Sequence, residues 1–215
     1  MRKTPVPQPR VIQKQYCDPI EVIWVHCLER LGWQLERSSE VFASWDGDRV
    51  LTIGQKADLD PDDSLAQLLL HELCHAFIEG KEAWQKTDWG LDNIDDRHLL
   101  NELACHRLQA ALADQVGLRS FFAVTTDWRP YYDSIPNQWN ALQTQKAILP
   151  WSEAFGCSLI DAKMLDQQAI AMAQRGLELL QNEVLFHQAI AEALDKTAKI
   201  AELLKPCVIQ TSLWF

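Results

Sequence analysis

The sequence predicts an α+β fold that is mostly helical: a small antiparallel sheet, then two helices that carry the polar motifs, then a pair of C-terminal helices. Three observations predict it. Apolar residues recur at helical spacing through most of the chain, and short strand patterns gather between residues 33 and 54. The length of 215 residues, with 47% hydrophobic and 23% charged residues, is enough to bury a core.

The N-terminal part is predicted to begin with a segment that does not fold. Residues 1–16 are expected to be a disordered arm, because the first fifteen residues include three prolines and four basic residues and lack the apolar core of a secretion signal. A helix is then predicted over residues 19–31. Its apolar positions lie on one side, and Gly32 can end it.

Three strands are predicted at residues 33–36, 40–45 and 49–53. Asp46-Gly47 stands between the last two, and this dipeptide is a strong signal for a hairpin turn. The sheet is therefore expected to be antiparallel and to come directly before the first motif helix.

The first motif helix is predicted over residues 65–78. Pro61 and Ser64 are residues that favour a helix start, and Gly80 can end the helix. Most positions between them are apolar, so the helix is expected to be largely buried. Polar side chains in its middle would then be costly unless they have partners.

The middle of this helix carries the sequence HELCH, an HExxH motif formed by His71, Glu72 and His75. Two histidines four residues apart project from one face of a helix, so both imidazoles can bind one zinc ion. A carboxylate beside them can take a proton from a metal-bound water. From the His and Glu content of this chain, the motif is expected by chance in about one chain in 100 of this length.

A catalytic zinc site needs a third protein ligand. A second helix is predicted over residues 95–115, and in it Glu102 and His106 lie four residues apart on one face. His98 lies four residues before Glu102 on the same face, and Glu79 lies four residues after His75 on the face of the first helix that carries the two histidines. By spacing alone, all four of these side chains are candidates for the third ligand.

An HExxH motif followed on the next helix by Asn101-Glu102 resembles the gluzincin metallopeptidases, the thermolysin-like clan. The resemblance covers roughly residues 40–117 and is specific at the two motifs. A looser resemblance is to small intracellular peptidases of the ImmA/IrrE type, which combine a short zincin core with a downstream helical glutamate.

The gluzincin resemblance implies a role for each motif residue. It implies that His71, His75 and Glu102 bind one Zn²⁺ ion and that Glu72 is the general base. The family often has an aspartate four residues after the glutamate ligand, where it hydrogen-bonds a ligand histidine. This chain has His106 there, and its role as such a partner, as an alternative ligand or as a plain helix residue stays open.

The pattern along the chain also predicts a domain organisation. Residues 17–120 are expected to form a zincin-like metal-binding core. Residues 121–215 are expected to begin as an aromatic, proline-broken region and to end in helices at 161–180 and 184–204, an antiparallel pair packed on the core. In zincins an edge strand beside the active helix can bind an extended peptide, and residues 50–54 are the candidate here.

The expected function is that of a hydrolase, a zinc metallopeptidase that cleaves a peptide or protein substrate. The oxyanion of such a reaction needs a hydrogen-bond donor besides the metal, and Tyr131, Tyr132 and His187 are candidates. Two other hypotheses are a non-catalytic zinc protein, in which His106 closes a four-ligand site, and a regulatory module whose zincin core has lost catalysis.

The composition of the chain narrows the classes of partner that we expect it to bind. The net charge of −10 at pH 7 argues against binding nucleic acid, and no apolar run approaches the 18 residues of a membrane span. The six cysteines lack CxxC spacing and are expected to be reduced, with Cys74 and Cys105 packed in the core beside the proposed ligands. A cytoplasmic protein is expected, and the oligomeric state is left open.

Overall fold

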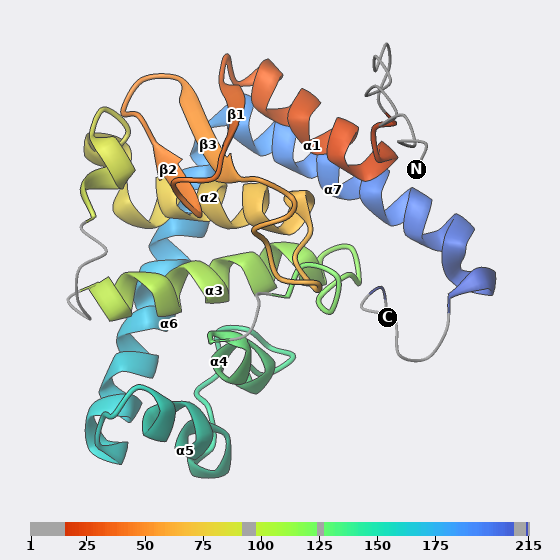
Figure 1. Cartoon of the computed structure of the whole chain (residues 1–215). Helices are drawn as coiled ribbons and strands as arrows, with labels where there is room; N and C mark the ends of the chain where they lie inside the picture. The colour runs from red at the N-terminus through yellow and green to blue at the C-terminus, as the bar shows by residue number, and fades with distance from the viewer. Residues whose placement is uncertain (1–15, 92–97, 124–126, 209–213, 215) are drawn as a thin grey trace, which may run out of the picture.

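The computed structural model describes residues 16–91, 98–123, 127–208 and 214. Over these residues the chain is mostly helical with one small sheet, so the α+β class is confirmed (Figure 1). The predicted arm at residues 1–16 lies outside the described residues except for its last position. The elements follow in the order α1 (Pro19–Arg30), β1 (Gln34–Ser38), β2 (Ala43–Trp45), β3 (Val50–Gly54), α2 (Leu65–Glu79), η1 (Lys81–Ala83), η2 (Thr87–Gly90), α3 (Leu99–Asp114), α4 (Arg129–Ser134), α5 (Gln145–Ala154), α6 (Leu159–Asn182), α7 (Val184–Leu204) and η4 (Lys205–Cys207).

The sheet has the order β1-β3-β2, and it is mixed rather than antiparallel. The predicted hairpin between β2 and β3 is confirmed. Its turn is closed by the Asp46 carboxylate, which accepts the backbone N–H groups of Asp48, Arg49 and Val50 at 2.8–2.9 Å. Gly47 has the positive φ of 84° that this turn requires. The pair β1 and β3 is parallel, so the purely antiparallel prediction is wrong.

The position of β3 corrects a second prediction. Residues 50–54 were expected to be an edge strand that could bind a peptide, but β3 is the central strand, paired on both sides. The physical reason is burial: Leu51 and Ile53 are fully buried, whereas β1 is rich in polar residues and suits an edge. An extended peptide therefore cannot add to β3.

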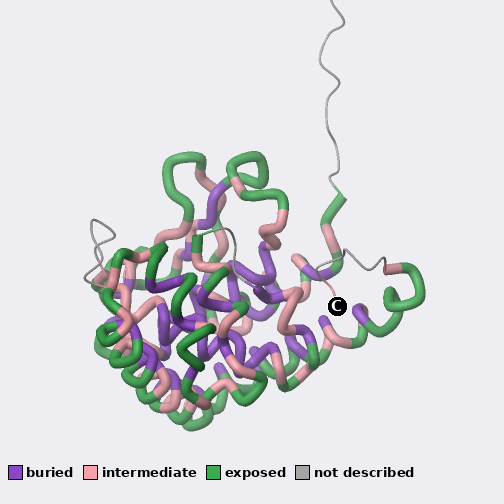
Figure 2. The backbone as a smooth tube through the Cα atoms, turned by 90° about the horizontal axis from the view of Figure 1, so that it is seen from below, coloured by how far each residue is buried: buried purple, intermediate pink, exposed green. Residues whose placement is uncertain are grey.

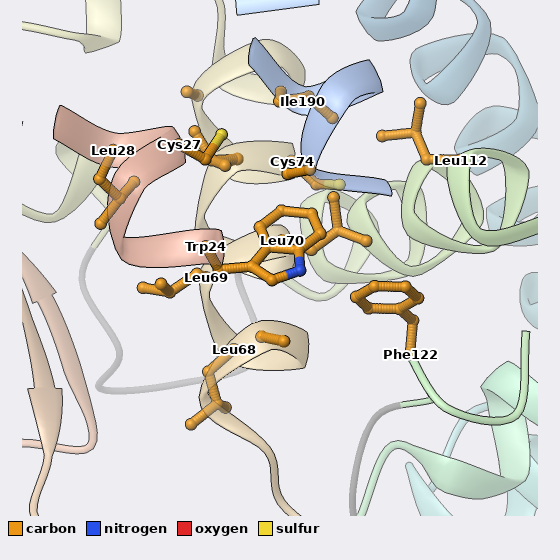
Figure 3. Packing of buried hydrophobic residues seen from close by; sticks show 14 of the residues in the cluster. Trp24, Cys27, Leu28, Leu68, Leu69, Leu70, Cys74, Leu112, Phe122 and Ile190 are labelled. Carbon is orange, nitrogen blue, oxygen red and sulfur yellow. The ribbon is translucent and has the colours of Figure 1, made fainter. Parts of the chain in front are cut away.

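The helix α2 lies at the centre of the molecule. The helices α1, α3 and α6 pack against it (Figure 1), and all of its residues are buried except His71, Ile78 and Glu79, which are half-buried. Figure 2 shows that the buried residues of the molecule gather in its interior. Figure 3 shows the part of the core where Trp24 of α1 packs against Leu69 and Leu70 of α2 and against residues from α3 and α7. The two histidines of α2 therefore sit in a helix that has almost no solvent-facing side.

The two C-terminal helices do not form the expected antiparallel pair. From the junction at Glu183, α6 crosses behind α2 and α3 while α7 runs along α1, and each helix contacts these partners more extensively than it contacts the other (Figure 1). The reason is that α1 offers α7 a buried face: the Trp24 indole N–H donates to Thr197 Oγ1 at 3.1 Å. Among the described residues, no helix is both long and apolar enough to cross a membrane.

A buried arginine fixes the segment after α3. Arg107 on α3 is fully buried, and its guanidinium donates to the Tyr131 hydroxyl at 2.9 Å, to the Ala141 carbonyl and to the Asp166 carboxylate on α6. The second oxygen of Asp166 accepts the backbone N–H of Gln143 at 3.0 Å. One ion pair thus joins α3, α4, α6 and the intervening loop.

We expect Arg107→Ala to lower the free energy of unfolding by about 3–5 kcal/mol, because Asp166 would remain as a buried charge without its partner. Arg129→Ala is the matched control: Arg129 pairs with the exposed Asp133 one turn away, so its loss should cost less than about 1 kcal/mol. Urea unfolding of both variants measures the difference. Equal losses would contradict the assigned role of the buried pair.

Candidate metal centre

The helix α2 presents two histidines on one face. Ser64 caps its N-terminus by accepting the backbone N–H of Gln67 at 3.1 Å, and Gly80 ends it with a positive φ of 81°. His71 and His75 are one turn apart, and their ring centroids are 4.8 Å from each other. The HExxH spacing therefore has the helical geometry that the sequence predicts.

The helix α3 lies alongside α2 and contributes the third side chain, Glu102 (Figure 1). The neighbouring residue Asn101 fixes the alignment of the two helices, because its side-chain NH₂ donates to both carboxylate oxygens of Glu79 at 2.7 and 2.8 Å. Glu102 is thereby directed toward the histidines.

His71, His75 and Glu102 converge on one point. His71 Nε2 lies 3.1 Å from His75 Nε2 and 3.5 Å from Glu102 Oε2, and His75 Nε2 lies 3.3 Å from Glu102 Oε1. Ligands bound to zinc at 2.0–2.1 Å in a tetrahedral arrangement are about 3.3 Å apart. The three distances lie close to this value, with Glu102 measured from Oε2 for His71 and from Oε1 for His75. The three side chains could therefore hold one metal ion, and among the described residues they are the group of titratable side chains with such geometry.

Both ligand histidines are oriented by α3. The Gln109 side-chain NH₂ donates to the Phe122 carbonyl at 2.7 Å, so its oxygen faces His71 and accepts from Nδ1–H at 3.0 Å. Cys105 Sγ lies 3.2 Å from His75 Nδ1. With each Nδ1 engaged on α3, each Nε2 is left to face the common point, as metal-binding histidines require.

In the metal-free protein, the interactions within the group favour a positive charge on His75 and a negative charge on Glu102. Burial opposes a charge on His75, but Cys105 and the Glu102 carboxylate outweigh it and hold the pKa of His75 well above its ordinary value. Burial likewise opposes a charge on Glu102, and His75 and His71 outweigh it, so the pKa of Glu102 lies well below its ordinary value. A cation that replaced the proton would meet the same attraction.

Glu72 follows His71 directly in α2 but is not one of the three converging side chains. Its side chain is 9% exposed, and Oε2 accepts the indole N–H of Trp89 at 3.2 Å. The three-donor group does not include Glu72. In an HExxH motif the carboxylate that takes a proton from a metal-bound water is likewise not a ligand.

His106 is buried next to the site without belonging to it. It is 1% exposed, and its ring stacks on His71 with the centroids 5.0 Å apart. Neither ring nitrogen has a hydrogen-bond partner. Burial, and after it the neighbouring His71, holds the pKa of His106 well below its ordinary value, so the ring is neutral.

The other candidate ligands lie apart from the converging atoms. Glu79 is engaged by Asn101, and its Oε1 lies 3.9 Å from the outer nitrogen of His75, Nδ1. His98 directly precedes α3 and is not in the three-donor group.

The proposed oxyanion donors have other partners. The Tyr131 hydroxyl accepts from Arg107 at 2.9 Å, and the Tyr132 hydroxyl donates to the Arg119 carbonyl at 3.2 Å. Burial raises the pKa of both phenols. His187 is exposed on α7, a helix that packs chiefly against α1 and α6. None of these three side chains is brought to the metal-binding atoms by a described hydrogen bond.

Three contributors to the site were not identified from the sequence. Cys105 and Gln109 follow Glu102 by three and seven residues, so the helical face that carries Glu102 could have revealed both. Trp89 lies in the loop between the motif helices and has no spacing signal. The chain matches no protein-family model, no curated protein and no solved structure.

We expect the purified protein to bind one metal ion per chain and to lose it in His71→Ala and in His75→Ala, because each change removes a ligand atom. Glu102→Ala should weaken binding in the same way. His26→Ala on α1 is the matched control, since this histidine is exposed and pairs with Glu29. Elemental analysis after gel filtration measures the metal. Unchanged metal content in both α2 variants would exclude the site.

Metal affinity should fall as pH falls. The raised pKa of His75 means that the metal-free site carries a proton near neutral pH, and the ion must displace it. Each displaced proton makes the affinity change about tenfold per pH unit. Competition against a chromophoric chelator between about pH 6 and 8 measures the slope, and an affinity that does not change over this range would contradict the proton displacement.

Proposed function

We propose that the protein is a zinc-dependent hydrolase that cleaves peptide bonds. The observation that carries the proposal is the convergence of three side chains: His71, His75 and Glu102 lie at metal-ligand distances, and Glu72, the residue that follows His71 in the HExxH motif, is not one of the three. Two imidazoles and one carboxylate are a donor set typical of catalytic zinc, and three protein ligands leave a position for water. This supports the gluzincin resemblance at the level of the site.

Partial exposure of the donors supports an open site. The side chains of His71 and Glu102 are 14% and 20% exposed, whereas that of His75 is 5% exposed. The group is therefore reached from the side of His71 and Glu102. A substrate carbonyl can approach there, and a purely structural ion would need no such access.

Zinc, when bound, lowers the pKa of a coordinated water to about 7 and polarises a carbonyl. Glu72 then accepts the proton of the attacking water and delivers it to the nitrogen of the departing amine. Gln109 and Cys105 keep the rings of His71 and His75 in place during this transfer. Peptide or protein substrates are proposed because the amide bond requires this combination of activated water and proton delivery.

A second candidate function rests on His106. Its two nitrogens are buried without partners, and an unpaired buried polar group costs about 1–3 kcal/mol, so a small rotation that placed His106 on the ion would be favourable. A four-ligand site of this kind would be structural. The two functions differ in the effect of His106→Leu, which should leave metal affinity unchanged for an open site and weaken it strongly for a closed one.

For the hydrolase, Glu72→Gln should keep the metal and the fold but lower hydrolysis by at least about 10²–10⁴-fold, because the base is lost while the shape is retained. The matched control is Glu82→Gln, an exposed glutamate of η1. A library of peptides assayed with metal-loaded protein measures the rates. Near wild-type hydrolysis by the Glu72 variant would refute the mechanism.

A further inference from the structure

The loop between the motif helices contains a strained turn at η2 (Thr87–Gly90). Asp88 has φ 48° and Trp89 has φ 58°, and they are the non-glycine residues with positive φ in the described part of the chain. A left-handed conformation costs a residue with a side chain roughly 1–2 kcal/mol. Two such residues in succession persist only where the surrounding structure holds them.

Contacts on two sides hold this turn. The Asp88 carboxylate accepts from the Ser44 hydroxyl at 2.7 Å and from the Trp45 backbone N–H at 3.0 Å, which fixes the turn to the edge of β2. The indole of Trp89 stacks on that of Trp45, with the centroids 4.8 Å apart and the planes 3° from parallel. The turn is thereby attached to the sheet through a carboxylate and an aromatic pair.

The turn directs one polar atom toward Glu72 on the motif helix α2. Trp89 is 4% exposed, and its Nε1–H donates to Glu72 Oε2 at 3.2 Å. We propose that Trp89 is a positioning residue, and that the strained turn holds its indole N–H against Glu72 so that this carboxylate stays beside the metal-binding atoms rather than on them. The kinetic consequence of this inference rests on the proposed hydrolase, whereas the position of Glu72 does not.

Packing alone does not account for the arrangement. Trp33 belongs to the same aromatic cluster, and its ring centroid lies 4.4 Å from that of Trp45 and 5.7 Å from that of Trp89. It packs there with an ordinary negative φ. A glutamate has three rotatable side-chain bonds, so an untethered carboxylate at this place could turn to the metal and become a ligand. A hydrogen bond from a rigid indole removes that freedom.

The first measurement concerns the position of Glu72 and needs no activity. In the ¹⁵N-labelled protein, the indole resonance that disappears in Trp89→Phe belongs to Trp89. In Glu72→Ala this resonance should move upfield, because the proton loses its carboxylate acceptor. In Trp33→Phe, the matched control from the same cluster, it should stay hydrogen-bonded and change little. A Trp89 resonance that is unaffected by Glu72→Ala would overturn the inference.

The second measurement concerns the reaction. Trp89→Phe keeps an aromatic ring but loses the donor, so kcat should fall roughly 10–100-fold while KM and metal content stay unchanged. Trp33→Phe should retain its kcat. In the Glu72→Gln background, Trp89→Phe should cause no further loss, since Trp89 acts only through Glu72.

The outcomes are distinguishable. Equal losses of kcat in Trp89→Phe and Trp33→Phe, or an unchanged kcat in both, would overturn the positioning role and leave the hydrolase standing. Absence of hydrolysis in the metal-loaded wild type would overturn the proposed function, and the Trp89 resonance alone would then decide whether the indole positions Glu72.

Discussion

Two histidines and a glutamate lie in the middle of α2, a helix whose other residues are almost all apolar and buried. Burying such groups without partners would cost several kcal/mol, so the chain must supply polar atoms from elsewhere. The helix α3 supplies most of them: Gln109 for His71, and both Cys105 and Glu102 for His75. The close packing of α2 on α3 is thus required by polar groups as much as by apolar ones.

Buried polar groups on α3 likewise need partners in other parts of the molecule. Its opposite face carries Arg107, another buried polar group, which finds its partner in Asp166 on α6. Gln109 bonds to His71 on one side and to the Phe122 carbonyl on the other, so it links the site to the backbone beyond the end of α3. α3 therefore stands between two polar networks, one around the candidate metal centre and one that fastens the C-terminal half.

The sequence predicts the parts of the site that obey a helical period. His71 and His75 follow from the motif, because residues four apart on a helix project from one face. Spacing made Glu102 one of four candidates for the third ligand, and the gluzincin resemblance singled it out. Tyr131 and Tyr132 were only candidates for the oxyanion donor, with no spacing argument behind them. Their hydroxyls bond to Arg107 and to the Arg119 carbonyl, and such tertiary partners are not encoded by a local pattern.

Strand order and strained loops escape prediction for related reasons. The hairpin of β2 and β3 was evident from Asp46-Gly47, whereas the insertion of β3 between β1 and β2 depends on which strand the helices bury. The left-handed pair Asp88 and Trp89 was not evident either, because aspartate adopts this conformation only occasionally and tryptophan is not a residue that marks it.

The attachment of Asp88 to β2 has a consequence for solubility. An edge strand offers unpaired N–H groups to any extended chain nearby, and such edges are where folded proteins join into aggregates. The Asp88 carboxylate occupies the N–H of Trp45 on the outer side of β2. The hydrogen bonds of Asp88 thus partly offset the conformational strain of the turn and also cover the edge of β2. A sequence change that released Asp88 would expose this edge to pairing with a second molecule.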